Sequence, residues 1–360
     1  MRLTRCTVQN LRILSAVALA PGPGLNLVVG ANASGKTSLL EAIYLLGRGR
    51  PLRPRHGDRL IRDGCDQLQV SGEIELDSGR RRAIGVARGA AGLQMRLDGQ
   101  PVRSALELAT ALPLQYIHPD IHQLVQSGPG LRRQFLDRGV FHVEHDFLET
   151  WRRYQRTLRQ RNAALKGGAH ARAWDGELAL QGERLDAMRV RYLEGLAPFL
   201  RANGAALLGR DDVAVVYRRG WSASQPMATM LADATAVDRR QGFTGRGAHR
   251  CDFALTLDGV AIQERVSRGQ QKLLLCALQL AQAQLQRQRT GSAGLLLIDD
   301  LPAELDTDHR ARLLDTVVAL DTQVFVTATD LALLDRAGTQ GAPVRVFHVE
   351  HGVVTPIKMV

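Results

Sequence analysis

The feature that most constrains this chain is the octapeptide Gly30-Ala31-Asn32-Ala33-Ser34-Gly35-Lys36-Thr37, which matches the pattern G-x-x-x-x-G-K-[ST]. Glycines let such a loop curl so that successive N–H groups point at phosphate oxygens. Only four of the 47 basic residues are lysines, so a lysine inside this turn indicates a chemical requirement. The octapeptide predicts a loop that holds nucleotide phosphates.

The segments on either side have the order that this loop needs. Leu25–Val29 is a short apolar run typical of a buried strand, and apolar spacing predicts a helix over Thr37–Leu46. The start of that helix would direct its positive end at the phosphates. We expect Lys36 to reach the β- and γ-phosphates of ATP and the Thr37 hydroxyl to bind Mg²⁺. The alternative is a glycine turn that only joins strand to helix. The predicted cofactor-binding residues here are Gly30, Ala31, Asn32, Ala33, Ser34, Gly35, Lys36, Thr37 and Ser38.

A second motif, Leu295–Asp300, is an apolar strand that ends in two carboxylates. Doubly wound folds place ligand-binding groups at the carboxyl ends of such strands. We expect Asp299 to hold Mg²⁺ and Asp300 to orient the attacking water as a catalytic residue. The alternative, that both acids cap the next turn, is weakened by the presence of the phosphate loop.

A third motif, Val266–Lys272, opens a helix with Ser267 as its N-cap. A helix start with serine and glycine is a second receptor for an anion. The segment is similar to the signature of ABC-type ATPases, in which this loop of one subunit covers the γ-phosphate bound by the other. We therefore predict nucleotide contacts for Ser267, Gly269 and Gln270, and place Ser267 with Lys36 among the catalytic residues. Taken alone, the segment also reads as an ordinary helix cap.

Together these motifs resemble the RecF family of recombination mediators, which are ABC/SMC-like ATPases. Further segments carry the resemblance over nearly the whole chain: Asn10–Arg12, Ala42–Arg50, Gly128–Asp137, Gln160–Leu165, Gly247–Asp252, Asp299–Asp306 and Thr327–Asp330. The chain departs from the family at Ala33, where glycine is usual, and at Ala248 and Cys251. None of these changes removes a nucleotide ligand.

The resemblance implies an α/β fold with an ABC/SMC-head-like P-loop ATPase lobe and an inserted, mainly helical second lobe. Residues 1–120 together with 240–360 would form the ATP-binding lobe, and residues 121–239 the insert. The same resemblance adds Arg12 to the residues expected to contact ATP. Helical apolar spacing over Arg132–Val140, Phe147–Leu165 and Ala173–Leu200 agrees with a helical insert.

The resemblance also implies a role in recombinational repair, the response to DNA damage and replication restart. ATP would join two copies head to tail around duplex or gapped DNA, or a junction with single-stranded DNA. A weak DNA-dependent ATPase activity would then separate them. RecO and RecR would be partners in loading RecA. Alternative interpretations of the sequence are the ATPase subunit of a transporter, another SMC- or Rad50-like ATPase, or a metabolic kinase. Ser267 lies 231 residues after Lys36, however, whereas transporters separate these motifs by roughly a hundred.

The net charge of +11 favours a polyanionic partner, and nucleic acid is the first candidate. Any single arginine has an ordinary alternative as part of a solvated face or as the partner of an acid such as Asp137 or Glu149. The DNA-binding candidates are Arg132, Arg133, Arg152, Arg153, Arg50 and Arg53, together with Arg156 and Arg159.

Composition excludes several other classes. No apolar run reaches the roughly 18–20 residues of a membrane helix, and the start lacks the apolar run of a signal peptide, so we expect a cytoplasmic protein without a membrane partner. The four cysteines lie far apart, which disfavours a disulfide framework or a zinc site.

Overall fold

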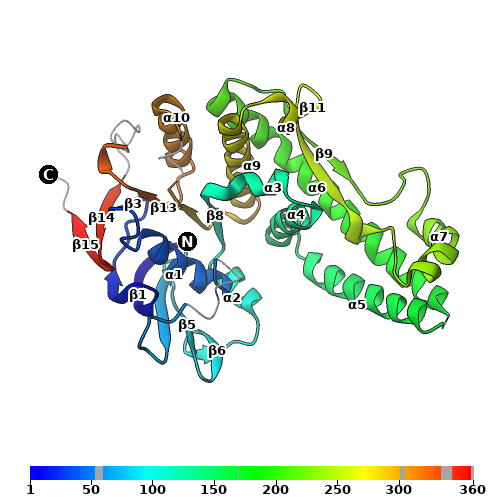
Figure 1. Ribbon diagram of the computed structural model, residues 1–360, viewed down its shortest axis with the longest axis horizontal. Helices are drawn as coiled ribbons and strands as arrows, with labels where there is room; N and C mark the ends of the chain where they lie inside the picture. The colour runs from blue at the N-terminus through cyan, green and yellow to red at the C-terminus, as the bar shows by residue number, and fades with distance from the viewer. Residues whose placement is uncertain (53–59, 169, 301–304, 334–342, 358–360) are drawn as a thin grey trace. The chain divides into compact units, whose positions relative to one another are not determined.

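The computed structural model describes residues 1–52, 60–168, 170–300, 305–333 and 343–357 (Figure 1). The chain divides into two compact units. The first contains Met1–Ile121, Ala206–Gly209 and Lys272–Val360, and the second contains His122–Ala205 and Arg210–Gln271. The expected lobes change at residue 240, whereas the units change between residues 271 and 272, inside a helix. Residues 240–271 therefore group with the helical unit.

The strand that precedes the phosphate loop lies inside one sheet of the first unit. Its strand order is β15-β14-β3-β13-β12-β8, and all neighbours are parallel except β15, which pairs antiparallel with β14. The central strands are buried along their whole length, as expected for parallel strands covered on both faces. The strands are β3 (Leu25–Val29), β8 (Leu114–Ile117), β12 (Leu295–Ile298), β13 (Gln323–Ala328), β14 (Val344–Glu350) and β15 (Val353–Ile357).

The second sheet of this unit is antiparallel throughout, in the order β2-β1-β4-β5-β6-β7. Buried and exposed residues alternate along β1, with Cys6 and Val8 in the core, because one sheet face covers that core. The strands are β1 (Arg2–Leu11), β2 (Leu14–Leu19), β4 (Leu68–Glu75), β5 (Arg81–Gly89), β6 (Gly92–Leu97) and β7 (Gln100–Pro101).

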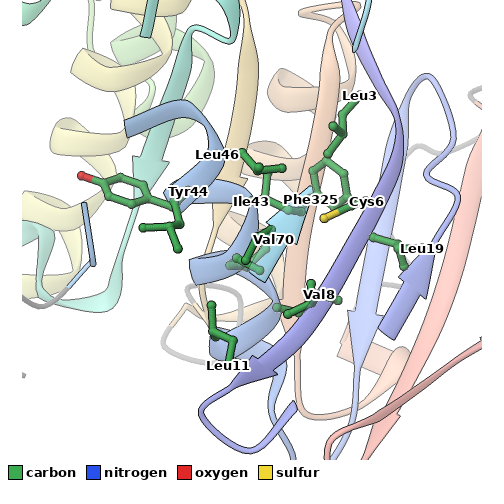
Figure 2. Packing of buried hydrophobic residues seen from close by; sticks show 14 of the residues in the cluster. Leu3, Cys6, Val8, Leu11, Leu19, Ile43, Tyr44, Leu46, Val70 and Phe325 are labelled. Carbon is green, nitrogen blue, oxygen red and sulfur yellow. The ribbon is translucent and has the colours of Figure 1, made fainter. Parts of the chain in front are cut away.

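Helix α1 (Lys36–Arg48) follows the phosphate loop and packs against both sheets. Figure 2 shows Ile43 and Leu46 of α1 among Val8, Val70 and Phe325, all fully buried. Burying a side chain of this size contributes about 2 kcal/mol. The loop is therefore anchored to an extensive apolar cluster of the unit. Among the described residues, this unit also contains α2 (Ala105–Ala111), most of α9 (Arg268–Thr290) and α10 (Thr307–Val318).

The second unit is mainly helical, and the three helical stretches predicted from apolar spacing are confirmed. It also contains a small antiparallel sheet in the order β11-β10-β9. The helices are α3 (Gln123–Gln126), α4 (Pro129–Val143), α5 (Phe147–Lys166), α6 (Asp175–Leu208), α7 (Met227–Gln241) and α8 (Ile262–Arg265). The strands are β9 (Val213–Arg218), β10 (Asp252–Leu257) and β11 (Val260–Ala261).

A buried arginine ties three segments of this unit together. Arg161 of α5 is fully buried and donates through Nε to Asp175 Oδ1 at 2.7 Å. Its Nη1 donates to Asp238 Oδ2 at 2.7 Å and to Thr244 Oγ1 at 2.8 Å. Asn162 Oδ1 accepts from the Thr244 N–H at 2.8 Å. The Gln160–Leu165 segment, which carries part of the family resemblance, thus serves the internal structure of this unit.

His249 is also an internal residue of the second unit. Its Nδ1 lies 2.7 Å from the Tyr154 hydroxyl and its Nε2 lies 3.0 Å from the Thr244 carbonyl. The neutral tautomer with the proton on Nε2 satisfies both contacts, because the hydroxyl then donates to Nδ1. Burial lowers the pKa of His249 to about 4.

No helix in the described part of the chain combines the length and apolar character needed to cross a bilayer.

Candidate nucleotide-binding site

The loop between β3 and α1 depends on its two glycines. A Cβ at Gly30 would lie 2.1 Å from the carbonyl oxygen of Val349, so a side chain has no room there. Gly35 has φ +118°, a conformation that only glycine adopts readily. Ala33, which stands where the family usually has glycine, has φ +63°. Holding an alanine in this left-handed region costs roughly 1–2 kcal/mol.

Lys36 folds back over the loop. Its Nζ donates to the carbonyl oxygens of Gly30 at 2.8 Å and Ala31 at 2.9 Å. Burial lowers the pKa of Lys36, and the charges of Asp300 and Asp299 oppose that shift. The nearby Ser34 Oγ is buried and has no hydrogen-bond partner in the described part of the chain. A glycine-rich cradle with an unpartnered hydroxyl and an ammonium group fits a polyphosphate.

Asp299 lies at the carboxyl end of β12 and is 4% exposed. Its Oδ1 accepts from Thr37 Oγ1 at 3.1 Å and from Thr327 Oγ1 at 2.8 Å. Its Oδ2 accepts from the Tyr116 hydroxyl at 3.0 Å. The structure thus brings the two predicted metal ligands, Thr37 and Asp299, into direct contact. A carboxylate beside a hydroxyl is a donor set that suits Mg²⁺, which prefers oxygen ligands.

Asp300 differs from its neighbour in conformation and environment. Its φ is +47°, and its backbone N–H donates to Thr327 Oγ1 at 2.8 Å. Its buried Oδ1 has no hydrogen-bond partner among the residues that the structure describes. Burial raises the pKa of Asp300 against the opposing charge of Lys36, and the charge of Asp299 adds to the rise. An unpartnered carboxylate oxygen with a raised pKa suits proton transfer. Residues 301–304, which continue the predicted motif, lie outside the described residues.

Arg12 is tied to the phosphate-loop helix. It lies just beyond β1 with φ +51° and forms a two-pronged ion pair with Glu41 of α1. Glu41 is almost fully buried and also accepts from the backbone N–H of Leu52 at 3.1 Å. Glu41 therefore anchors Arg12 one turn after Thr37 along α1.

The signature residues Ser267, Gly269 and Gln270 are exposed at the start of α9, in the second unit. The Ser267 N–H donates to Gln270 Oε1 at 3.1 Å, and the Gln270 N–H donates to Ser267 Oγ at 3.3 Å. This reciprocal pair is a capping box, so the side chains do cap the helix. The phosphate loop and both acids lie in the first unit.

The arginine candidates for DNA separate into two groups. Arg132 pairs with both carboxylate oxygens of Asp252, at 2.7 and 3.0 Å, and donates to the Ser127 carbonyl at 2.8 Å. Arg133 donates to the Cys251 carbonyl at 3.0 Å. These two side chains are thus engaged in internal contacts. Arg153 pairs with Glu149 on the surface, whereas Arg50 and Arg152 are exposed. Arg53 lies outside the described residues.

Sequence reasoning missed three residues that contact the predicted site: Tyr116, Thr327 and Glu41. Tyr116 lies on β8, whose parallel register places it opposite Leu297, two residues before Asp299. The β8 strand is only four residues long, so apolar spacing gave little signal for it. Glu41 lies in the helix predicted over Thr37–Leu46, and Thr327 lies in a segment that carries the family resemblance, but no local pattern marks their partners.

Comparison with known proteins identifies relatives over nearly the whole chain. The family described as RecF/RecN/SMC N terminal domain matches residues 2–355. A curated relative, the DNA replication and repair protein RecF of Stutzerimonas stutzeri (strain A1501), is 43% identical over 362 residues. That match covers 99% of this chain and 98% of the relative.

Solved structures share the fold. A structure of the recombination mediator protein RecF with ATP, in the RecFOR pathway, matches with a TM-score of 0.84 at 24% identity, covering 99% of this chain and 97% of that chain. An Smc head bound to the C-winged helix domain of ScpA matches with a TM-score of 0.62 at 14% identity, covering 100% and 98%. These likenesses confirm the predicted fold class, an α/β ATPase lobe of the SMC-head kind with a helical insert.

Proposed function

The chain belongs to the RecF family, and we propose that it is a DNA-repair ATPase that closes on DNA when it binds ATP. In this proposal, ATP joins two copies around duplex or gapped DNA, and slow hydrolysis lets them separate. The observation that carries the proposal is the cluster at the carboxyl end of the parallel sheet, where Lys36, Thr37 and Asp299 lie beside the glycine loop.

The phosphate loop would provide most of the nucleotide affinity. Backbone N–H groups of residues 30–38 and the start of α1 attract the phosphates. Lys36 would exchange its two carbonyl contacts for phosphate oxygens, since those neutral acceptors are weaker partners for an ammonium group. Arg12, held by Glu41, would add a guanidinium hydrogen-bond donor at the same helix.

Asp299 and Asp300 would have different roles in hydrolysis. Thr37 and Asp299 would hold Mg²⁺, which neutralises charge on the β- and γ-phosphates when bound. Asp300 would orient the attacking water and take up its proton, because its Oδ1 has no hydrogen-bond partner among the described residues. A catalytic aspartate is one methylene shorter than the glutamate common in ABC ATPases. We therefore expect slow turnover.

The signature would act on the nucleotide of a second copy. Ser267, Arg268, Gly269 and Gln270 are all exposed and open a helix. The capping box uses the N–H groups of Ser267 and Gln270, so an anion would be bound by the N–H groups of Arg268 and Gly269. The capping box fixes the conformation of this turn before a partner arrives. A head-to-tail pair related by a two-fold axis would have two nucleotide sites, each covered once by the signature of the other copy.

The exposed face of α5 is the DNA contact that we favour. Arg152, Arg156 and Arg159 are spaced four and three residues apart, so they follow one face of this helix. All three are exposed, and none forms an ion pair with another described residue. Such charges contact the phosphate backbone without reading base sequence. Arg50 is a further exposed candidate.

Membership of the RecF family supports a role for this proposed activity in replication and recombinational repair. RecO and RecR would be its partners, and loading of RecA onto single-stranded DNA the outcome. We place the protein in the cytoplasm, where its DNA and ATP are found.

Size-exclusion chromatography with light scattering, with and without ATP and Mg²⁺, tests the proposal. We expect the mass to double only with nucleotide, and fluorescence anisotropy of a labelled duplex to rise under the same conditions. Lys36→Ala should remain monomeric and bind the duplex no better with ATP than without. A wild-type chain that stays monomeric with ATP and Mg²⁺ would contradict the ATP-driven dimer.

A further inference from the structure

The carboxylate of Asp299 accepts hydrogen bonds from three hydroxyls, and only one belongs to the phosphate-loop helix. Thr37 is the predicted metal ligand. The other two donors, Thr327 on β13 and Tyr116 on β8, flank β12 from its two sides. Both carboxylate oxygens are therefore held from neighbouring strands of the same sheet.

Thr327 connects the two acids through a single oxygen atom. Its Oγ1 accepts from the backbone N–H of Asp300 at 2.8 Å, and it donates to Asp299 Oδ1 at 2.8 Å. A hydroxyl carries one proton, and an N–H group is only a donor, so the threonine proton must point at Asp299. Thr327 is fully buried, which leaves this arrangement without competition from water.

Tyr116 holds the other oxygen, and its ring is itself fixed. The hydroxyl donates to Asp299 Oδ2 at 3.0 Å. The ring stacks on His118 with centroids 5.6 Å apart and meets Tyr44 of α1 edge-on at 5.8 Å. Tyr44 belongs to the phosphate-loop helix. The ring contact with Tyr44 thus fixes the Tyr116 hydroxyl relative to the helix that carries Thr37.

We propose that Tyr116 and Thr327 are positioning residues that orient Asp299 for the divalent cation, an inference that rests on the proposed nucleotide site. Two hydroxyl donors fix the carboxylate in one rotamer, so that it does not have to be ordered when the cation binds. Partners of metal ligands commonly change metal affinity by about 10–100-fold when they are removed. We expect an effect of that size here.

The test separates metal affinity from nucleotide affinity. A fluorescent N-methylanthraniloyl derivative of ATP is titrated with protein at a series of Mg²⁺ concentrations, and once in excess EDTA. Tyr116→Phe removes one oxygen and keeps the ring, and Thr327→Val is close to isosteric. Both should raise the Mg²⁺ concentration for half-maximal enhancement of binding by about 10-fold or more. Affinity in EDTA should stay within about 2-fold of wild type.

Thr327→Ser is the matched control, because it keeps the hydroxyl while removing a methyl group. The Mg²⁺ dependence of Thr327→Ser should stay close to that of wild type. If Thr327→Val does not fold, Tyr116→Phe carries the test alone. An unchanged Mg²⁺ midpoint in Tyr116→Phe and Thr327→Val would overturn this inference and leave the proposed function standing. A wild-type chain that binds no nucleotide would overturn both.

Discussion

Asp299 and Asp300 are adjacent in sequence, yet their surroundings assign them different chemistry. Asp299 accepts hydrogen bonds from three hydroxyls, whereas Asp300 has a left-handed backbone and a buried oxygen without a partner among the described residues. Environments that separate two carboxylates in this way are a mark of acid–base sites. Thr327 contacts both acids, so one buried hydroxyl helps to establish the difference.

Replacing Asp300 tests this division of roles. Asp300→Asn should bind ATP and dimerise, but hydrolyse ATP about 10²–10⁴-fold more slowly, because an amide does not accept the proton of the attacking water. The complex with DNA should last correspondingly longer. Phosphate release and DNA dissociation are measured in parallel, with Asp321→Asn, a change at an exposed acid, as the control. Wild-type turnover in Asp300→Asn would assign the base to another residue.

His249 gives a prediction about pH. Its folded-state pKa of about 4 lies below the usual value of 6.5, so the fold favours the neutral ring. The stability that this ring contributes is present above pH 6.5 and is lost as the pH falls towards 4. Between pH 7 and pH 5 the loss is about 2 kcal/mol. Glutamine does not titrate. The free energy of unfolding in urea should therefore fall less between pH 7 and pH 5 for His249→Gln than for the wild type. Parallel pH profiles for the two proteins would contradict the assignment.

At the scale of elements, α5 presents two kinds of arginine. Arg161 is fully buried between Asp175 and Asp238, whereas Arg159 faces solvent. Arg161→Gln should lower the free energy of unfolding by about 3–5 kcal/mol, because it leaves two buried acids without a counter-charge. Arg159→Gln should change it by less than about 0.5 kcal/mol. Urea denaturation monitored by circular dichroism measures both. Similar losses in the two variants would mean that Arg161 is not the centre of a buried network.

The elements that sequence predicted well are those with strong local signals. The phosphate loop, the acidic strand and the helices of the insert follow from glycine positions or apolar spacing, and all appear in the structure. Contacts between distant residues could not be predicted this way. Asp252 forms an ion pair with Arg132, 120 residues away in sequence, and Tyr116 donates a hydrogen bond to Asp299, 183 residues away. Arginine spacing alone could not separate Arg132, which has internal partners, from Arg156, which is exposed.

The boundary between the lobes shows a related limit. The family resemblance implies a border at residue 240, but the compact units change inside α9, between Gln271 and Lys272. A continuous helix carries no sequence break at such a point. Local patterns therefore locate elements better than they locate the borders between groups of elements.

At the scale of the whole molecule, the net charge of +11 predicts how binding to DNA responds to salt. Binding should need ATP, depend weakly on sequence and weaken as salt rises. Arg156→Gln should reduce the slope of log affinity against log salt by about one. Arg153→Gln is the matched control, because Arg153 already pairs with Glu149. Anisotropy titrations at several salt concentrations measure both, and a flat salt dependence of the wild type would rule out a phosphate clamp.

The order of strands around the loop has a consequence for how the chain is made. The loop strand β3 lies between β13 and β14, which leave the ribosome about 300 residues later. At roughly 5–20 residues per second, β3 waits about 15–60 s for its neighbours. The N–H of Gly352 then closes on the Ser34 carbonyl at 2.9 Å. The phosphate loop is translated early, yet it is thus among the last parts of the chain to become able to bind nucleotide. A nascent chain halted before β13 would carry the complete octapeptide and bind no ATP.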